Sequence, residues 1–551
     1  MPRCLSRPIL ALVALSIHPM ANALERVELL PPEAHTFATI SNTTNFWSSL
    51  QKSSVGRLWM DRQFQDFLGN PDAETWQALF LDGETDAEDQ VFLEQLKMLG
   101  GELALAFDLK TGEAYIVAAM GKADFDRSLE LDEKLNETSG NPFKIIKSSF
   151  QDVEIIQHIE DPGTPEESSS WQAHVGNTFV LGHTCEWVER CIAQLRKEEV
   201  SEPTGNPVLE LHIPLADLFR ESIPEGSKGD DQRNAVKAFG LMGMERFTTR
   251  IELLGDRMLV DNNMAISDLQ RGLFSLLDTK PSELPTVTFI PENISSLEVG
   301  RFSLLGLWRE IPLFLGTAQP QAKPQFDMMT GMLRQQTGID IEQDLLAHLG
   351  TQYISFSTIE GERQVSAIAL ELEDGMAFKQ GLERALAAPA IQPYVASGLE
   401  LTDFLDHTIY TLKNAQSGDD MGVALIDDYL LYGTVEGLRQ VIRSESSEAA
   451  ANTAFERSEL VQGLRANLTP RAFGFSVVDW RKNMAAIIAE LTKPEITTAI
   501  QQQWAKAGSP LPPPDFNKLP PADHIASFFN VSYQYTEESK DGLHQRIILK
   551  Y

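Results

Sequence analysis

The sequence predicts an α+β protein made of two tandem copies of a mostly antiparallel sheet packed with helices. Two observations lead to this prediction. The chain of 551 residues is similar to itself at an offset of about 250 residues, and apolar strand segments along it are joined in pairs by short polar turns. Single amphipathic helices separate the strand pairs, which is typical of an α+β fold and not of a doubly wound parallel sheet.

The internal similarity follows one order of elements in both halves. The apolar strand at 103–107 matches the strand at 353–356, and a turn, a second apolar strand and a helix follow in each case. Because the elements recur in the same order, the sequence predicts a duplication with copies at 24–277 and 278–551. Matching positions are Leu99 and Leu349, Tyr115 and Val365, Phe125 and Phe378, and Trp187 and Leu438.

Strand pairs with short connections recur along the chain. The segments 173–182 and 424–433 each read as a strand, a two-residue polar turn and a second strand. Apolar and polar residues also alternate through 143–159 and 247–266. Since a parallel pair needs a crossover of a dozen or more residues, these short turns predict antiparallel pairing.

Three segments rich in turn-forming residues are expected to be loops, at 161–170, 199–207 and 509–521. The last is a proline-rich connector with few backbone donors, so we expect it to be extended and semi-rigid. Packing of this connector against the rest of the chain is the simpler interpretation, and docking to a proline-recognising partner is the alternative.

Residues 1–23 are expected to form a cleaved signal peptide. Arg3 and Arg7 precede the apolar stretch 9–17, and Ala21 and Ala23 place small residues at the positions that a signal peptidase admits. The apolar stretch is shorter than the roughly 20 residues of a membrane-spanning helix. Cleavage near Ala23 therefore predicts a soluble mature chain, periplasmic or secreted.

The two cysteines after the signal peptide, Cys185 and Cys191, lie in one expected helix at 184–195. Six helical residues rise about 9 Å, whereas the Cα atoms of a disulfide lie roughly 4.4–6.8 Å apart. The spacing predicts two free thiols.

The charge of the chain argues against nucleic-acid partners. Acidic residues outnumber basic ones by 79 to 46, the net charge is −33, and no basic run is longer than Arg196-Lys197. A nucleic-acid binder needs clustered Lys and Arg, and anionic membrane surfaces are disfavoured for the same reason. We interpret the acidity as a source of solubility, with a cationic ligand or calcium as the alternative.

No motif identifies a catalytic residue or a cofactor. The segment 474–478 lacks the second glycine of a serine-hydrolase elbow, and zinc-helix, phosphate-loop and dinucleotide motifs are absent from the sequence. Zinc-type ligands cluster in the first copy, but an apolar residue matches Cys191 in the second, so we predict core packing and no metal site. The candidate metal ligands are His174, His183, Cys185 and Cys191, and their counterparts are Leu425, Thr434, Glu436 and Ile442.

Three methionines at helical spacing, Met328, Met329 and Met332, offer a soft apolar surface. Core packing is the expected role of such a group.

Two stretches carry a family resemblance. One is Leu29 to Ala34 followed by Trp47 and 55–58, and the other is Thr337 to Leu346 followed by Leu349-Gly350. Together they resemble a family of exported bacterial proteins of about this length whose domain has no known function. The resemblance covers most of the mature chain and implies export and architecture, with no catalytic residues to carry over.

The leading functional prediction is a cell-envelope protein with a binding or scaffolding role, whose sheet faces hold an apolar or amphipathic molecule. One alternative is a hydrolase with an unrecognised acidic site acting on glycan or cell-wall material, which two facing carboxylates about 5–10 Å apart would favour. A second alternative is a surface interaction protein, which an apolar patch rimmed by charge would favour.

Overall fold

A computed structural model of the chain describes residues 26–551 except for 27, 32–35, 70–93, 96–97, 109–110, 139–142, 161, 165–166, 198–207, 224–226, 270–271, 285–288, 292, 362, 394–397, 413–419, 447–457 and 507–512. The expected signal peptide at 1–23 lies outside the described residues. Within the described part, no helix combines the length and the apolar composition that crossing a membrane requires.

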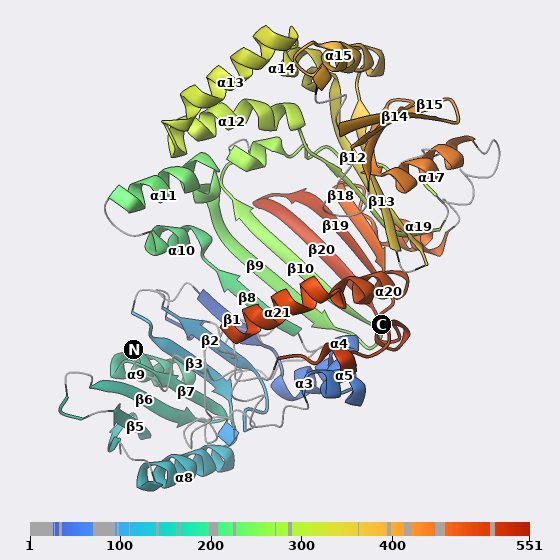
Figure 1. The fold of residues 1–551 in the computed structure, drawn as a ribbon. Coiled ribbons are helices and arrows are strands. Elements are labelled where there is room, and N and C mark those ends of the chain that lie inside the picture. Colours follow the sequence, from blue (N-terminus) through green and yellow to red (C-terminus); the bar gives the residue numbers. More distant parts are fainter. Residues whose placement is uncertain are drawn as a thin grey trace.

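One antiparallel sheet of twenty strands runs through the described part of the molecule (Figure 1). The α+β class and the antiparallel pairing are therefore confirmed. The strands before residue 270 are β1 (Thr36–Ile40), β2 (Leu103–Phe107), β3 (Ala114–Ala119), β4 (Lys144–Phe150), β5 (Val153–Glu160), β6 (Ser168–Val175), β7 (Thr178–Gly182), β8 (Val208–Ile213), β9 (Met244–Leu253) and β10 (Arg257–Ile266). The later strands are β11 (Ile294–Arg301), β12 (Leu349–Glu360), β13 (Arg363–Leu372), β14 (Leu399–Phe404), β15 (His407–Leu412), β16 (Met421–Ile426), β17 (Tyr429–Thr434), β18 (Ala472–Asp479), β19 (Val531–Ser539) and β20 (Gly542–Lys550).

The spatial order of the strands differs from their order along the chain. From one edge the sheet runs β4, β5, β6, β7, β3, β2, β1, β8, β9, β10. It continues through β20, β19, β18, β11, β12, β13, β17, β16, β15 and β14 at the other edge. The ladder between β10 and β20 therefore joins the first ten strands to the last ten within the sheet.

Close backbone approach at this central ladder requires a glycine. Gly542 begins β20 with φ 145°, and a Cβ atom there would lie 2.2 Å from the carbonyl oxygen of Met264. A residue with a side chain would therefore push β20 away from β10 at the end of the ladder.

Helices and short 3-10 turns cover parts of both faces. Those of the first half are α3 (Thr43–Lys52), α4 (Ser54–Trp59), α5 (Arg62–Phe67), α8 (Lys122–Thr138), α9 (Cys185–Leu195), α10 (Leu215–Ser222), α11 (Ser227–Ala238), η1 (Leu241–Gly243) and η2 (Gly272–Leu276). Those of the second half are α12 (Leu304–Ala318), α13 (Ala322–Thr337), α14 (Ile341–Asp344), η3 (Leu346–His348), α15 (Gly375–Ala387), α17 (Val435–Ser446), α19 (Glu459–Asn467), α20 (Trp480–Leu491), α21 (Pro494–Lys506), η4 (Phe516–Lys518) and α22 (Ala522–Ala526).

Side-chain caps fix where several helices begin. Thr184 accepts a hydrogen bond from the Trp187 amide at the start of α9, and Ser303 accepts one from the Gly306 amide at the start of α12. Each cap satisfies an amide that has no partner inside the helix.

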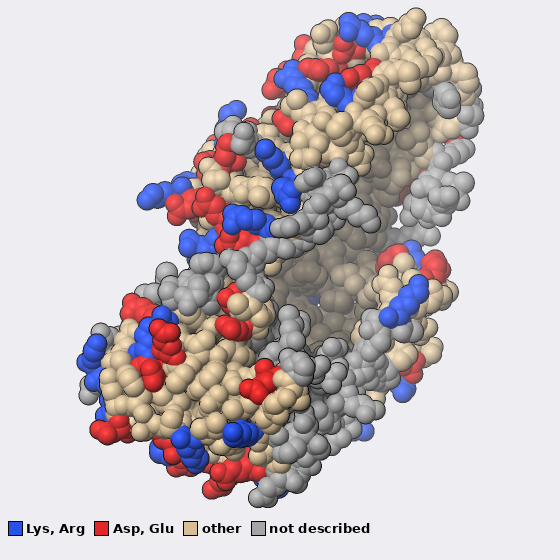
Figure 2. Space-filling model, turned by 90° about the vertical axis from the view of Figure 1, so that its left-hand side faces the viewer, with Lys and Arg blue, Asp and Glu red and all other residues tan. Residues whose placement is uncertain are grey.

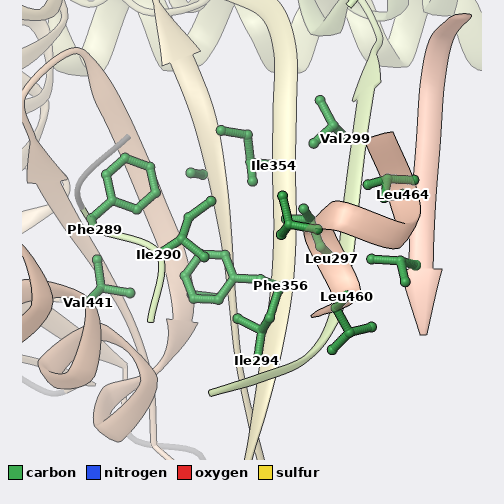
Figure 3. Packing of buried hydrophobic residues seen from close by; sticks show 14 of the residues in the cluster. Phe289, Ile290, Ile294, Leu297, Val299, Ile354, Phe356, Val441, Leu460 and Leu464 are labelled. Atoms are coloured by element: carbon green, nitrogen blue, oxygen red, sulfur yellow. The ribbon is translucent and has the colours of Figure 1, made fainter. Parts of the chain in front are cut away.

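One face of the sheet, called here the closed face, carries two covered hydrophobic cores. Near β4–β7, helix α9 packs Trp187 and Ile192 against the strands. Near β11–β18, helices α17 and α19 pack Leu438 and Leu464 onto a larger core, which Figure 3 shows. Side chains at the centre of this larger core, such as Val299, are fully buried.

The other face, called here the open face, is covered mainly in the first half. There Phe46 of α3 and Phe125 of α8 join Ile40 and Leu209 in a third core. In the second half α20 lies on this face, because Trp480 donates a hydrogen bond from Nε1 to Ser532 Oγ over 3.0 Å.

The chain enters the fold through a buried ion pair. Arg26 and Glu102 are 2% and 0% exposed, and Arg26 Nη1 lies 2.5 Å from Glu102 Oε2. Three residues later, the carbonyl oxygen of Leu29 accepts a hydrogen bond from Trp187 Nε1 over 3.0 Å. The segment next to the expected cleavage site is thus part of the core under α9.

The expected loops are only partly loops. Ser168 to Ser170 begin strand β6, where they pair with β5, so the prediction of a loop through 161–170 is wrong at its end. Pairing with a neighbouring strand outweighs the turn preference of three serines. The segment 199–207 lies outside the described residues. The described part of 509–521 contains η4, where Phe516 packs on Phe67 with ring centroids 5.5 Å apart.

Candidate ligand-binding surface

The three strands at the centre of the sheet present an almost wholly apolar surface on the open face, called here the central platform. Its strands are β9, β10 and β20, whose registers align the open-face side chains in four rows. Three rows are apolar, and one contains uncharged polar residues. The rows are Phe247–Met264–Leu543, Thr249–Asn262–Gln545, Ile251–Val260–Ile547 and Leu253–Met258–Leu549.

Most side chains of the central platform are less covered than those of the cores, but one end of the platform adjoins the third core. Leu253 belongs to that core, and Ile251 and Met258 pack against it. Thr249 and Leu253 are buried, whereas the other platform side chains are half-buried. At about 3.4 Å per residue along a strand and 4.8 Å between strands, the four rows span roughly 20 Å by 10 Å. This is a size that suits an elongated small molecule.

The polar row is tied together across the three strands. Thr249 donates its hydroxyl hydrogen to Asn262 Oδ1, and Asn262 Nδ2 donates to Gln545 Oε1 over 2.9 Å. The row therefore carries amide and hydroxyl groups without a net charge.

Next to the platform the open face continues with little charge. On the neighbouring strand β19 the open-face residues are Ser532, Gln534, Thr536 and the exposed Glu538. Seen from the left-hand side of Figure 1, the molecule is hollowed between its upper and lower parts, and the visible walls of the hollow carry few charged side chains (Figure 2).

A second apolar region lies on the open face near the edge strand β14, called here the outer patch. One row crosses five strands as Leu401, Tyr410, Val423, Tyr432 and Ile368. The exposed fractions of Leu401, Tyr432 and Ile368 are 56%, 43% and 38%, and the adjacent Leu412 is 50% exposed. Exposed large apolar side chains that are contiguous mark interaction or binding surfaces.

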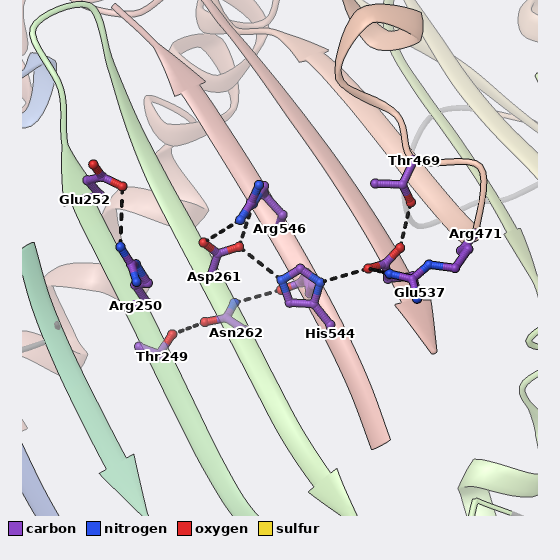
Figure 4. Close-up of polar contacts among 11 residues, drawn as sticks. Thr249, Arg250, Glu252, Asp261, Asn262, Thr469, Arg471, Glu537, His544 and Arg546 are labelled. Carbon is purple, nitrogen blue, oxygen red and sulfur yellow. Dashed lines mark hydrogen bonds and ion pairs between the residues drawn. The ribbon is translucent and has the colours of Figure 1, made fainter. Parts of the chain in front are cut away.

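The closed face of the same central strands is charged. Arg546 of β20 binds Asp261 of β10 in a bidentate pair, with distances of 2.6 Å and 3.0 Å (Figure 4). His544 Nε2 lies 3.0 Å from Asp261 Oδ1, and His544 Nδ1 lies 3.4 Å from Glu537 Oε1. Arg471 completes the row with a 3.0 Å contact to Glu537.

These contacts set the charge of each group. Burial opposes ionisation of Asp261, but hydrogen bonds from His544 and Arg546 outweigh it and lower the pKa of Asp261. Burial likewise opposes ionisation of Glu537, and hydrogen bonds from Thr469 and His544 lower its pKa. The hydrogen bond to Asp261 raises the pKa of His544.

These shifts favour the ionised form of each carboxylate and the protonated form of the imidazole that lies between them. A glycan hydrolase needs one carboxylic acid whose pKa is raised, so that it can give a proton to the leaving group. The geometry of this network suits a clamp across the β10–β20 ladder better than proton transfer.

A raised carboxyl pKa does occur elsewhere, in the first half. Burial raises the pKa of Asp132 in α8 to about 6, and Gln95 Nε2 donates to its Oδ1 over 2.7 Å. Nearby, His158 Nε2 lies 3.1 Å from Gln172 Nε2, and burial lowers the pKa of His158 to about 4. Burial therefore shifts each of these two groups toward its neutral form.

The candidate metal ligands do not converge. His174 stacks on Phe125, which belongs to the core of the open face, whereas Cys191 belongs to the core under α9 on the closed face. Among the described residues no group of three or more His, Cys, Asp and Glu is placed to hold a metal ion. Cys185 and Cys191 are both free thiols, as predicted.

The expectation that Met328, Met329 and Met332 pack in a core is wrong. Their exposed fractions are 62%, 59% and 48%. Helix α13 packs on α12, where the rings of Phe326 and Trp308 lie 5.5 Å apart, and this contact leaves the three methionines largely exposed.

Sequence reasoning did not find the central platform. The alternation of apolar and polar residues in 247–266 indicated strands with two different faces, but it did not show which face stays uncovered. The partner strand β20 is almost 300 residues away in sequence, so the four rows exist only once the fold brings the strands together.

Comparisons with known proteins do not assign this chain to a family. No protein-family model and no curated protein matches the chain. Two solved structures, crystal forms I and IV of TP0453, are similar over 44% and 42% of this chain and over 79% and 78% of their own chains, with 8% and 7% identity. The TM-score is 0.23 in both cases, and a likeness at that level carries no argument on fold or function.

Proposed function

We propose that this chain is an exported protein of the cell envelope that binds an apolar or amphipathic molecule on the open face of its sheet. The observation that carries the proposal is the central platform, where eight of the nine apolar side chains are half-buried while the charges of the same strands point to the closed face. The part of these apolar side chains that stays exposed costs roughly 25 cal/mol for each Å², and a ligand that covers it recovers this free energy.

We also propose that the fold arose from two tandem copies, at 24–277 and 278–551. The strand order supports this, since the second set of ten strands repeats the order of the first, with β14 in the place of β4 and β20 in the place of β10. In such an arrangement the central platform lies where the two copies meet, which is a common place for ligand sites.

The two copies differ in how their open faces are covered. In the first half Phe125 and Phe179 close the face into a core, with ring centroids 5.9 Å apart. In the second half Tyr432 and Ile368 of the outer patch stay exposed. This difference supports the open face of the second half as an extension of the binding surface.

A dye titration tests the proposed function. Nile red is uncharged and fluoresces when it enters an apolar site, so the mature protein is expected to bind it saturably. Replacement of Val260 by Lys places a charge at the middle of the central platform, where it lacks a partner, and is expected to weaken dye binding at least about tenfold.

A matched control is available on the same strand. Asn263 is exposed on the closed face, so Asn263→Lys adds the same charge without touching the platform. We expect dye binding by Asn263→Lys to equal that of the wild type. Absence of saturable Nile red binding by the folded wild-type protein would contradict the proposal, and so would equal binding by Val260→Lys.

A further inference from the structure

The platform restricts the charge of what it binds. None of the twelve positions in its four rows is Lys, Arg, Asp or Glu. The ends of the same strands carry basic residues, but these occupy closed-face positions in the register: Arg246, Arg257 and Lys550. On that face Lys550 Nζ lies 5.1 Å from the centroid of the Tyr533 ring. A bound anion would therefore lack a counter-charge among the described platform residues.

Acidic groups stand on the open face beside the platform. Glu538 pairs in register with Leu543 at one end of it, and Glu298 lies further along the sheet, where it accepts a hydrogen bond from Tyr353 over 2.7 Å. Both carboxylates repel an anionic head group. Both lie on the same side of the platform, on β19 and β11, and the platform rows themselves offer no carboxylate to pair with a cation.

The polar row supplies the hydrogen-bonding groups for a ligand that the apolar rows lack. Thr249 and Asn262 use their side chains on each other, and Gln545 accepts from Asn262 through Oε1. The Nε2 group of Gln545 is the donor at the end of this row of hydrogen bonds. Gln545 lies between Leu543 and Ile547 among the open-face residues of β20. An ester, alcohol or amide oxygen of a ligand suits such a donor, because a neutral hydrogen bond needs no counter-charge.

We propose that the platform selects an uncharged amphiphile, with an elongated apolar part along the strands and a neutral hydrogen-bonding group at the Thr249–Asn262–Gln545 row. This inference rests on the proposed function and names the ligand class. The long direction of the platform, roughly 20 Å, accommodates an acyl chain laid along β10 and β20.

The test compares three soluble probes that share one alkyl length and differ in charge. Monodecanoylglycerol, decanoate and decylammonium compete with Nile red for the wild-type protein at pH 8, where decanoate is ionised and decylammonium is protonated. We expect monodecanoylglycerol to displace the dye at a concentration at least about tenfold lower than either ion, since each ion loses its hydration without gaining a partner.

Two variants at Gln545 test whether the polar row causes the preference for the uncharged probe. Gln545→Lys supplies a cation and is expected to reverse the preference, so that decanoate becomes the best competitor. Gln545→Met keeps the size and removes the donor. The dissociation constant of monodecanoylglycerol, corrected for the Nile red affinity of the same variant, is therefore expected to rise about three- to tenfold. Asn263→Lys, on the closed face, is the control for added charge and should leave the order of the probes unchanged.

The outcomes separate the two proposals. If the wild type does not bind Nile red, the proposed function fails. If it binds Nile red but decanoate or decylammonium competes as well as monodecanoylglycerol, the ligand class is wrong and the function stands. If Asn263→Lys shifts the preference as Gln545→Lys does, the change reflects net charge and the assignment to the polar row is overturned. Gln545→Met keeps the test decisive if Gln545→Lys does not fold.

Discussion

The buried ion pair between Arg26 and Glu102 gives the most quantitative prediction. Glu102→Gln removes the negative charge and leaves the guanidinium of Arg26 in a core where its side chain is 2% exposed. Breaking a buried ion pair by removing one partner costs about 3–5 kcal/mol, because the remaining charge stays desolvated. With an m-value of about 2 kcal/mol/M for the cooperative unit, the urea midpoint should fall by about 1.5–2.5 M.

The assay is urea unfolding of the mature protein, followed by tryptophan fluorescence. Trp187 reports on the affected core, because its Nε1 donates to the carbonyl of Leu29. The double variant Arg26→Met with Glu102→Met replaces the pair by apolar side chains and should recover most of the loss. As a matched control, Asp126→Asn breaks the exposed pair with Lys122 and should shift the midpoint by less than about 0.3 M.

An unchanged midpoint in Glu102→Gln would refute this reasoning. It would mean that Arg26 is solvated in the native state and that the segment next to the expected cleavage site does not belong to the core. A double variant no more stable than the single one would refute the narrower statement that the loss comes from an unpaired buried charge.

Three further predictions concern titration and reactivity. The pKa of His544 is raised in the folded state, so protonated His544 stabilises the fold. This contribution is complete below the unfolded pKa and is lost as pH rises through the folded pKa. In urea unfolding, His544→Gln should therefore destabilise the protein more at pH 6 than at pH 9. The pKa of Asp132 is also raised in the folded state, to about 6, so ionisation of this buried carboxyl lowers the stability at neutral pH. Asp132→Asn should therefore raise the free energy of unfolding by about 1–3 kcal/mol at pH 7.5 and have little effect near pH 3.5. Equal effects at both pH values would contradict this explanation. Burial raises the pKa of Cys191 to about 12, so iodoacetamide at pH 8 should leave Cys191 unmodified in the native protein and modify it in urea, as mass spectrometry of its peptide would show.

Much of the local structure could be predicted from the sequence. The strand pairs at 143–159 and 247–266 form with the expected partners, because alternation and short turns are properties of neighbouring residues. The helix that carries Cys185 and Cys191 begins one residue after its Thr184 cap, and both thiols are free because one helix cannot bring them together.

Long-range arrangement could not be predicted. The pairing of β10 with β20, and of Asp261 with Arg546, joins residues 285 apart, and no local pattern encodes such a partner. Coverage by another element could not be predicted either. The helical spacing of Met328, Met329 and Met332 does not tell whether a neighbouring helix covers them, and the structure leaves them exposed. The binding surface depends on both kinds of information, on which strands meet and on which faces stay uncovered.

The most direct test of the central claim is native mass spectrometry of the mature protein purified gently from its own host. The account predicts that the wild type carries an uncharged molecule in stoichiometric amount, that Val260→Lys loses it and that Asn263→Lys keeps it. A wild-type protein whose mass matches the bare chain, or a Val260→Lys variant that retains the molecule, would contradict binding at the central platform.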